Sequence, residues 1–294
     1  MAMKVFITGG SGWVGTAVVP ELIAAGHEVT ALARSERSAE ALSAQGAQLV
    51  SGGLDDLDVI REQAAVSDGV VHLAFRHDMA DFAEAAAVDA GVVAVLGDAL
   101  SGSGKPLVIT GGTPGVPGVI ADETHRAAPG TPAIGREIVS DAALAFADQN
   151  VRSSVIRLPR SVHGMGDHGF VAMLAKIARD EGVSGFVGDG DQRWPAVHVQ
   201  DAARLYRLAL ESAPAGSVLH AVGDEGIPFR EIAEAIGRAV GSPAGPVDPQ
   251  HLGFLGMLAS VDQPATATRT RQLLGWAPER PGLIADIEAG AYQG

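Results

Sequence analysis

A glycine-rich turn near the start of the chain constrains the fold more than any other feature. The loop TGGSGWVG, residues 8–15, joins an apolar segment of strand length, Lys4–Thr8, to an amphipathic segment, Gly12–Ala25. Gly9, Gly12 and Gly15 have the spacing GxxGxxG, a variant of the dinucleotide fingerprint. The first glycine allows the tight turn, the second lets the backbone approach a pyrophosphate, and the third lets the helix pack on the strand. Because the free N–H groups of the helix N-terminus favour phosphates, the sequence predicts a strand–turn–helix unit that binds a dinucleotide.

The first half of the chain repeats this alternation of short apolar and longer amphipathic segments. Strands are predicted at Lys4–Thr8, His27–Ala33, Gln48–Ser51, Gly69–Ala74, Pro106–Thr110 and Ser153–Leu158, and helices at Gly12–Ala25, Ser38–Gln45, Asp56–Ala65, Met79–Leu100 and Arg136–Gln149. This spacing indicates βαβ units and a parallel sheet, and strands so uniformly apolar fit a sheet that helices cover on both faces. The predicted fold class is therefore α/β, a Rossmann-type doubly wound parallel sheet.

The regularity weakens after Pro159. Residues 185–194 are predicted to form a polar loop and residues 241–249 a Gly/Pro linker, while Asp201 is the predicted N-cap of a helix at Ala202–Glu211. A last helix is predicted at Thr268–Leu274. The expected organisation is a nucleotide-binding Rossmann domain of residues 1–160, completed by about residues 196–222. Residues 161–195 and 223–294 are expected to form a smaller, substrate-binding lobe.

Composition excludes several classes of function. The net charge of the 294 residues is −14, whereas a nucleic-acid binder needs a basic surface. There is no cysteine, so disulfides, thiolate catalysis and thiolate metal sites are excluded. No apolar stretch approaches the roughly 18 residues of a membrane span, and the first residues lack the features of a signal peptide. We therefore expect a cytoplasmic protein without a membrane or nucleic-acid partner.

The residue that follows the second predicted strand indicates which dinucleotide binds. Sites specific for NAD usually carry Asp or Glu there, which accepts hydrogen bonds from the ribose hydroxyls. Arg34 occupies this position, and its guanidinium suits a 2′-phosphate. Arg37 is a second candidate for the same contact, and a solvated loop arginine is the alternative interpretation of Arg34. The expected cofactor is NADP(H).

Several segments, taken in order, resemble the extended short-chain dehydrogenase/reductase family, which includes the NAD-dependent epimerase/dehydratase group. They are TGGSGWVG, then GGLDD at residues 52–56, VVHLAF at 70–75, VIRLPRSVHG at 155–164, AVHVQDAARL at 196–205 and RQLLGWAPERPGL at 271–283. Together with Arg34, the residues that this resemblance implies for the cofactor are Gly9, Gly12, Trp13, Val14, Gly15, Leu54, Leu73, Ala74, Phe75, Thr110, Gly111, Leu158 and Pro159. The family often dimerises through the helices that correspond to residues 79–100 and 136–149, so a homodimer and a monomer both stay open.

The chain departs from the family at the catalytic residues. Members usually carry a YxxxK motif on the helix before the sixth strand, where Tyr transfers the substrate proton and Lys lowers the pKa of that Tyr and holds the ribose. The chain has only Tyr206 and Tyr292, and neither lies there. Ile134 and Ile138 are predicted to stand where Tyr and Lys would. Cofactor binding is therefore expected, whereas catalysis has to use other residues.

Two residues at the ends of predicted strands are candidates for that catalysis. Thr113 follows the fifth strand, and its hydroxyl is expected to orient a carbonyl group. His163 follows the sixth strand, and an imidazole titrates near neutrality, so it is expected to supply the proton directly or through water. A hydrogen-bonded loop histidine is the alternative for His163. Arg136 and Glu137 are predicted to be solvated helix residues.

The expected substrate pocket consists of Arg76, His77, His168, Phe170 and Trp194, with ordinary packing as the alternative for Trp194. No metal site is expected from the histidines, since the i, i+4 chelating spacing is missing.

The expected function is an NADPH-dependent reductase that transfers hydride to a carbonyl, or an imine, of a small hydrophobic molecule. Two alternatives stay open. One is a nucleotide-sugar epimerase or dehydratase, against which the missing Tyr and Lys stand. The other is a non-catalytic NADP(H)-sensing regulatory protein, which their absence favours.

Overall fold

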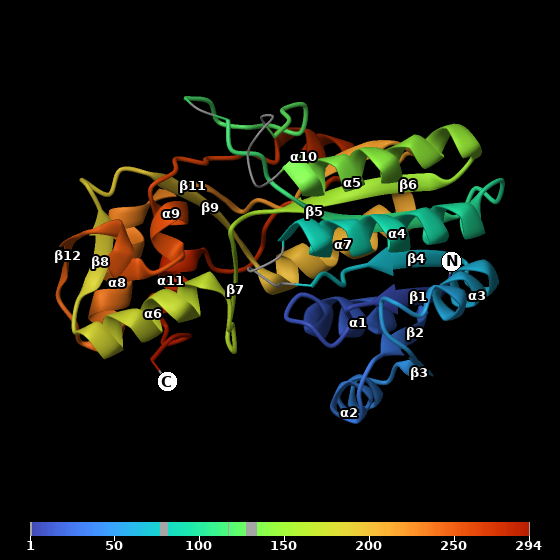
Figure 1. The fold of residues 1–294 in the computed structure, drawn as a ribbon, viewed down its shortest axis with the longest axis horizontal. Helices are drawn as coiled ribbons and strands as arrows, with labels where there is room; N and C mark the ends of the chain where they lie inside the picture. The colour runs from blue at the N-terminus through green and yellow to red at the C-terminus, as the bar shows by residue number, and fades with distance from the viewer. Residues whose placement is uncertain (1, 77–81, 117, 128–133, 294) are drawn as a thin grey trace.

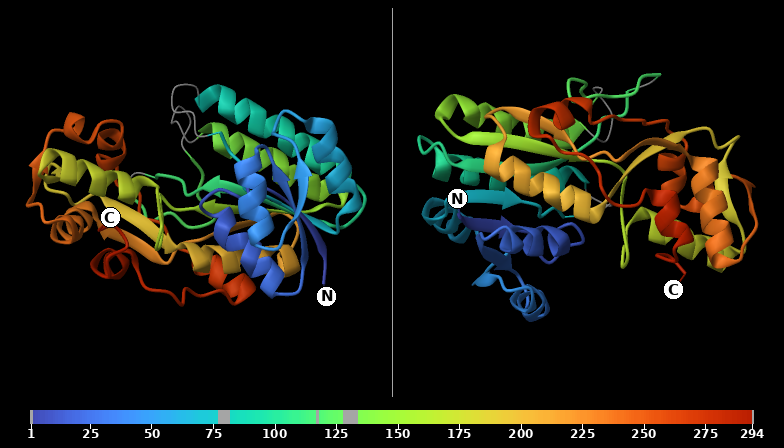
Figure 2. Two further views of the ribbon diagram at one scale, coloured as in Figure 1. Left: turned by 90° about the horizontal axis from the view of Figure 1, so that it is seen from below. Right: turned by 180° about the vertical axis from the view of Figure 1, so that it is seen from behind.

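A seven-stranded parallel sheet forms the centre of the computed structural model, which describes residues 2–76, 82–116, 118–127 and 134–293. Its strand order is β10-β6-β5-β4-β1-β2-β3 (Figures 1 and 2). The strands are β1 Lys4–Thr8, β2 Glu28–Ala33, β3 Gln48–Ser51, β4 Gly69–His72, β5 Pro106–Gly112, β6 Arg152–Leu158 and β10 Ser217–His220. The winding direction reverses between β1 and β4, and open α/β sheets bind ligands at the carboxyl edge of such a switch point. The predicted fold class is confirmed.

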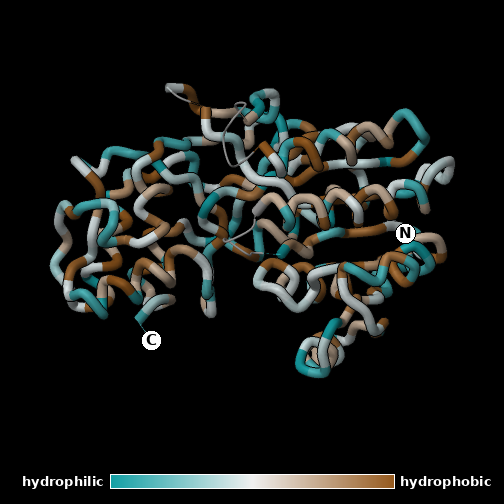
Figure 3. The backbone as a smooth tube through the Cα atoms, in the orientation of Figure 1, coloured by the Kyte–Doolittle hydropathy of each residue, from teal (hydrophilic) through white to brown (hydrophobic). Residues whose placement is uncertain are grey.

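Helices cover both faces of this sheet. One face carries α1 Gly15–Ala24, α2 Glu36–Ala44, α7 Val199–Ser212 and α10 Thr268–Leu274, and the other carries α3 Leu57–Val66, α4 Phe82–Leu100, α5 Ile134–Ala145 and η1 Phe146–Gln149. Successive strand residues face opposite sides, so Ile7 packs in the first layer and Phe6 in the second. The outlying α2 is hydrophilic over most of its length and buries only Leu42 (Figure 3).

A second group of elements, which we call the smaller lobe, lies beside the sheet (Figure 2). It consists of β7 Ser161–His163, α6 Phe170–Glu181, β8 Ser184–Val187, β9 Arg193–His198, β11 Asp224–Pro228, α8 Phe229–Val240, β12 Ala244–Val247, η2 Pro249–Leu252, α9 Leu255–Ala259 and α11 Leu283–Glu288. The strands pair as β11-β9-β7 and as β12-β8. Since β10 and α7 return to the central sheet, the chain crosses between the two groups repeatedly. The expected domain boundary at residue 160 stays a prediction.

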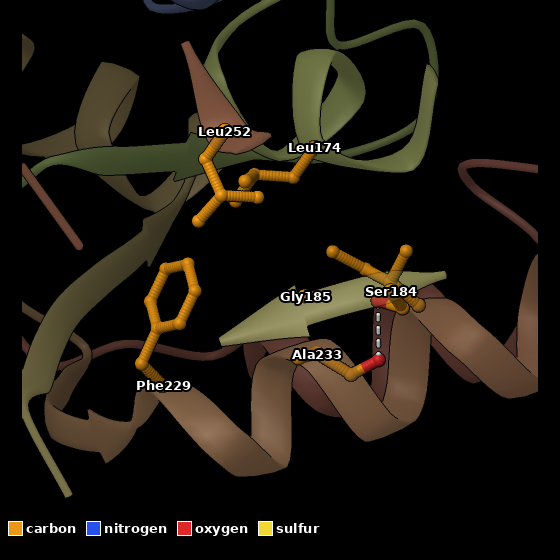
Figure 4. Close-up of a pocket in the computed structure, with 7 residues that line it drawn as sticks. Leu174, Ser184, Gly185, Phe229, Ala233 and Leu252 are labelled. Carbon is orange, nitrogen blue, oxygen red and sulfur yellow. Dashed lines mark hydrogen bonds between the residues drawn. The ribbon is translucent and has the colours of Figure 1, made fainter. Parts of the chain in front are cut away.

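The core of the smaller lobe contains a narrow gap, shown in Figure 4. Leu174, Phe229 and Leu252 surround it, and the Ser184 hydroxyl beside it donates a hydrogen bond of 2.7 Å to the carbonyl of Ala233. The gap has no room for a water-sized sphere, so it belongs to the packing of the core rather than to a ligand site. None of the helices in the described ranges is long and apolar enough to cross a membrane.

Three local predictions for the second half are wrong. Residues 185–194 are not a loop, since they contain most of β8 and the start of β9, and residues 241–249 contain β12. These strands are short and rich in glycine and proline, and they form because β8 and β12 pair with each other in parallel across about 60 residues of chain. Asp201 is not an N-cap: His198 caps α7 by accepting from the N–H of Gln200. The Asp201 carboxylate instead accepts from the N–H groups of Glu279 and Arg280 at 2.9 Å, which fastens the C-terminal segment to α7.

Candidate functional site

The glycine loop between β1 and α1 forms a cradle at the switch point. Gly9 has a φ of +73°, and a Cβ there would lie 2.5 Å from the backbone nitrogen of Ala74. A Cβ on Gly15 would lie 2.3 Å from the carbonyl oxygen of Gly9. The protein itself therefore requires glycine at both positions, because these neighbours are backbone atoms that cannot turn away. At Gly12 a Cβ would meet only the Gly9 carbonyl, at 3.3 Å, so this residue faces open space.

The same cradle fits the phosphates of a dinucleotide. Val14 is the N-cap of α1, and its side chain makes no capping hydrogen bond. Thr16 and Ala17 in the first turn of α1 donate to the carbonyls of Gly12 and Val14. The N–H groups of Trp13, Val14 and Gly15, which lead into the helix, make no backbone hydrogen bond within the described ranges, so they are the donors left for a phosphate. Arg34 is exposed directly after β2 and makes no ion pair within the described ranges. The residues present therefore fit a bound dinucleotide.

The other expected cofactor residues gather at the carboxyl ends of the strands. Leu73, Ala74 and Phe75 follow β4, Thr110 and Gly111 lie near the end of β5, and Leu158 and Pro159 end and follow β6. Leu54 is half-buried after β3. Trp13 leaves the cradle and donates from its indole nitrogen to the carbonyl of Val162 in the smaller lobe, at 2.7 Å. These positions share one edge of the sheet, while their contacts with a cofactor stay predictions.

A chain of buried polar side chains lies under this edge. Oγ1 of Thr8, the last residue of β1, is 2.6 Å from Nδ1 of His72, the last residue of β4. Nε2 of His72 is 2.9 Å from the carboxylate of Asp89 on α4. All three residues are less than 5% exposed. Thr110 on β5 continues the polar layer, since its hydroxyl donates to the His72 carbonyl at 3.0 Å and lies 2.8 Å from the hydroxyl of Tyr206. Burial raises the pKa of Tyr206, which keeps this phenol protonated.

Arg136 completes this layer, and its expected solvation is wrong. Its guanidinium donates to the Thr110 carbonyl at 2.5 Å, lies 3.6 Å from the Asp89 carboxylate and stacks over the ring of Phe75, 4.1 Å from the ring centroid. Its side chain is only 16% exposed, and burial lowers its pKa while Asp89 opposes that shift. Glu137 is buried as well, in an ion pair of 2.8 Å with Arg157.

The exposure of the side chains on α5 shows why Arg136 was not predicted to be buried. Ile138, placed at the lysine position of YxxxK, is 61% exposed. Arg136 instead shares a face with buried Val139, Ser140 and Ala143. These four residues have the spacing i, i+3, i+4, i+7, but only Val139 and Ala143 are apolar, so hydrophobic periodicity gave little signal for Arg136. The residue on α5 that turns toward the sheet edge is therefore Arg136.

The two expected catalytic residues are both buried. Thr113 follows β5, where its N–H donates to the Leu158 carbonyl at 3.0 Å and its hydroxyl has no hydrogen-bond partner in the described part of the chain. His163 is fully buried in β7, with Nδ1 at 2.6 Å from the Asp286 carboxylate and its ring 5.5 Å from that of His198. A substrate would therefore reach His163 only through a water molecule or a rearrangement, and both catalytic roles stay predictions.

The expected pocket residues differ in their surroundings. Arg76 forms an ion pair with Asp55 on the surface. His168 packs edge-on to Trp13, with ring centroids 5.9 Å apart. Phe170 packs edge-on to Phe254, with ring centroids 6.1 Å apart. Trp194 is fully buried against Phe229, with ring centroids 4.8 Å apart, so its ring belongs to the core of the smaller lobe. His77 lies outside the described residues. Within the described ranges, no group of three His, Asp or Glu side chains is placed to hold a metal ion.

Comparison with known proteins places this geometry in a family. Residues 5–221 match the family described as NAD dependent epimerase/dehydratase family. The chain belongs to this family. Membership confirms the resemblance seen in the sequence, and it supports an enzyme of the short-chain dehydrogenase type with a nicotinamide nucleotide as its cofactor.

Relatives cover almost the whole chain. An uncharacterized protein of Schizosaccharomyces pombe is 42% identical over 99% of this chain and 100% of its own length. The 2-alkyl-3-oxoalkanoate reductase of Stenotrophomonas maltophilia is 29% identical over 82% of this chain and 77% of its own. The solved UDP-glucose 4-epimerase of Thermus thermophilus, in complex with NAD, has a TM-score of 0.77 and 21% identity, with 99% of this chain and 98% of that chain covered. At that identity the likeness shows the fold alone.

Proposed function

We propose that this protein is an NADPH-dependent reductase that transfers hydride to the carbonyl carbon, or an imine carbon, of a small hydrophobic molecule. The observation that carries the choice of cofactor is Arg34, an exposed guanidinium at the end of β2 beside the cradle. A carboxylate there would repel a 2′-phosphate, whereas a guanidinium binds one through charge-assisted hydrogen bonds. When bound, NADPH supplies the hydride.

The proposed substrate is a ketone with an aliphatic chain. The relative from Stenotrophomonas maltophilia is a 2-alkyl-3-oxoalkanoate reductase, and a relative from Stigmatella aurantiaca is a ketoreductase of a farnesyl-substituted dihydroquinoline oxide. Both names describe a ketone that carries an apolar substituent, which is an alkyl group in one and a farnesyl group in the other. We extend this class to the present chain as the starting point for an assay.

Thr113 and His163 retain their proposed roles at this site. The Thr113 hydroxyl would orient the carbonyl group, since it lies at the carboxyl end of β5 without a partner among the described residues. Nε2 of His163 is also buried without a partner among them, so any proton it supplies would pass through water. The expected pocket residues, the homodimer and the cytoplasmic location also stay predictions.

The environment of the two tyrosines bears on the alternatives. Tyr206 is fully buried against Thr110, and the hydroxyl of Tyr292 donates to Asp167 at 2.8 Å in the smaller lobe. Neither phenol lies on α5, so neither restores the chemistry that epimerases of the family need. The same observation favours the second candidate, a regulatory protein that binds NADP(H) without turnover.

One assay separates the reductase from the regulatory protein, and a separate incubation with a nucleotide sugar tests the epimerase. The purified protein is incubated with NADPH or NADH and a panel of aliphatic 3-oxo esters and cyclic imines, and the absorbance of the reduced nicotinamide is followed. We expect consumption of NADPH with at least one substrate and a preference over NADH of about tenfold or more. Tight NADPH binding without turnover would favour the regulatory protein. Interconversion of a nucleotide sugar without net oxidation would favour the epimerase.

A further inference from the structure

The buried polar layer at the sheet edge needs an explanation beyond folding. Asp89 and Arg136 come from α4 and α5, and their side chains are only 5% and 16% exposed, with Arg136 over the ring of Phe75. Burying an ion pair gains little stability over apolar side chains of similar volume, because both charges lose their hydration. A carboxylate, an imidazole and a guanidinium held in contact at a ligand-binding edge are therefore candidates for a role in the reaction.

The position of Arg136 relative to the cradle suggests that role. Its guanidinium stacks on Phe75, and Ala74, the residue before Phe75, is the backbone neighbour that forces glycine at position 9. In a doubly wound sheet the adenosine half of a dinucleotide extends from the cradle toward the end of β2, here Arg34. The nicotinamide half then extends the other way, over β4 and β5. Arg136 contacts Phe75, three residues after β4, and Thr110, near the end of β5, so it lies on the side of the cradle where the nicotinamide is expected.

We propose that Arg136 stabilises the negative charge that forms on the carbonyl oxygen of the substrate during reduction, and that Asp89, His72 and Thr8 position it. This inference rests on the proposed reductase function. As the carbonyl carbon accepts the hydride, the π electrons of the C=O bond move to oxygen, and a proton from water completes the alcohol. A fixed cation beside that oxygen lowers the barrier without itself giving up a proton. This role is compatible with proton delivery from His163 through water, because the cation stabilises the charged oxygen before the proton arrives.

The first test removes the cation. Loss of a donor to a developing oxyanion typically lowers kcat by about a hundredfold to a thousandfold, and we expect this for Arg136→Met. The Kd for NADPH, measured by fluorescence titration, is expected to change by less than about threefold. In Arg136→Ala, millimolar guanidinium is expected to restore much of the lost kcat. Arg152→Met is the matched control. Arg152 is a partly buried arginine at the amino end of β6, away from the site, and it donates to carbonyls at the C-terminal end of α7. This control variant is expected to lower thermal stability and leave kcat unchanged.

Two results would overturn this role. One is a kcat of Arg136→Met close to that of the wild type, and the other is a loss of kcat in Arg136→Ala that guanidinium does not restore. Arg136→Lys, which keeps the charge, is expected to fold and to retain an intermediate kcat, so that the comparison survives if the smaller substitutions do not fold.

A double substitution tests the positioning residues. Asp89→Asn is expected to lower kcat in the wild-type background but to have no further effect on kcat in the Arg136→Met background, since Asp89 acts through Arg136. An equal loss of kcat in both backgrounds would show that Asp89 serves the fold or the site independently, and would remove it from the proposal.

A binding measurement keeps this inference separate from the reductase proposal. Octanoate presents a carboxylate in place of the charged oxygen, on an aliphatic chain. It is expected to bind the NADP⁺-loaded protein by calorimetry, with an affinity about tenfold to a hundredfold lower in Arg136→Met. If the wild type reduces none of the ketones, the reductase proposal fails while octanoate still tests the cation. Equal octanoate affinity in both proteins, or no binding to the wild type, would overturn the placement of Arg136.

Discussion

Substitution of two glycines in the same loop should separate cofactor binding from folding. In Gly12→Ala and Gly12→Val the new Cβ would meet only the Gly9 carbonyl, at 3.3 Å, and the φ of Gly12 is not in the left-handed region. Both variants should therefore fold, with a loss of stability of about 1 kcal/mol or less. In Gly15→Ala the Cβ would lie 2.3 Å and 2.5 Å from the carbonyl oxygens of Gly9 and Gly10, so backbone has to move. Overpacking of this kind costs about 1–3 kcal/mol or more.

The Gly12 variants, which should lose little stability, should lose affinity for NADPH. A side chain at Gly12 enters the space in front of the α1 N-terminus, and a steric cost of about 1–3 kcal/mol corresponds to a roughly tenfold to hundredfold weaker affinity, with valine worse than alanine. Urea unfolding measures the free energy of unfolding, and fluorescence titration with NADPH measures Kd. If Gly12→Val folds and binds NADPH like the wild type, the cradle does not hold the pyrophosphate.

Three further predictions concern Arg34, the catalytic candidates and acid stability. Arg34→Ala should weaken NADPH binding about tenfold to a hundredfold and leave NADH binding nearly unchanged; a wild type that prefers NADH would contradict the choice of cofactor. His163→Ala should lower kcat about a hundredfold to ten-thousandfold with unchanged NADPH affinity if the histidine supplies the proton, and Thr113→Val should lower it less; wild-type kcat in both would exclude them. Burial lowers the pKa of His220 to about 4 from 6.5, so the unfolded chain binds the extra proton between these values and stability falls as the pH falls from 6.5 toward 4. The loss from this group between pH 6.5 and 5 should be about 2 kcal/mol, and urea unfolding of His220→Asn should show a correspondingly flatter pH dependence.

Local sequence patterns predicted the elements of the central sheet. The bounds of β1, β3 and α10 agree with the predicted segments, because an apolar strand or an amphipathic helix shows its period within its own residues. The pairing of β8 with β12 could not be predicted in this way. Each strand has four residues with glycine or proline among them, and its hydrogen-bond partner lies far along the chain.

The sequence by itself determined the glycine cradle and the family, since strand, turn and helix are contiguous there and each glycine has a local geometric reason. Only the tertiary structure decided what surrounds that cradle. Arg136 lies in the polar layer because α5 docks with this residue toward β5, and Asp201 binds the C-terminal segment rather than capping its own helix. Such contacts join residues tens of positions apart. They therefore depend on how the helices and strands pack against one another rather than on the residues within each helix or strand.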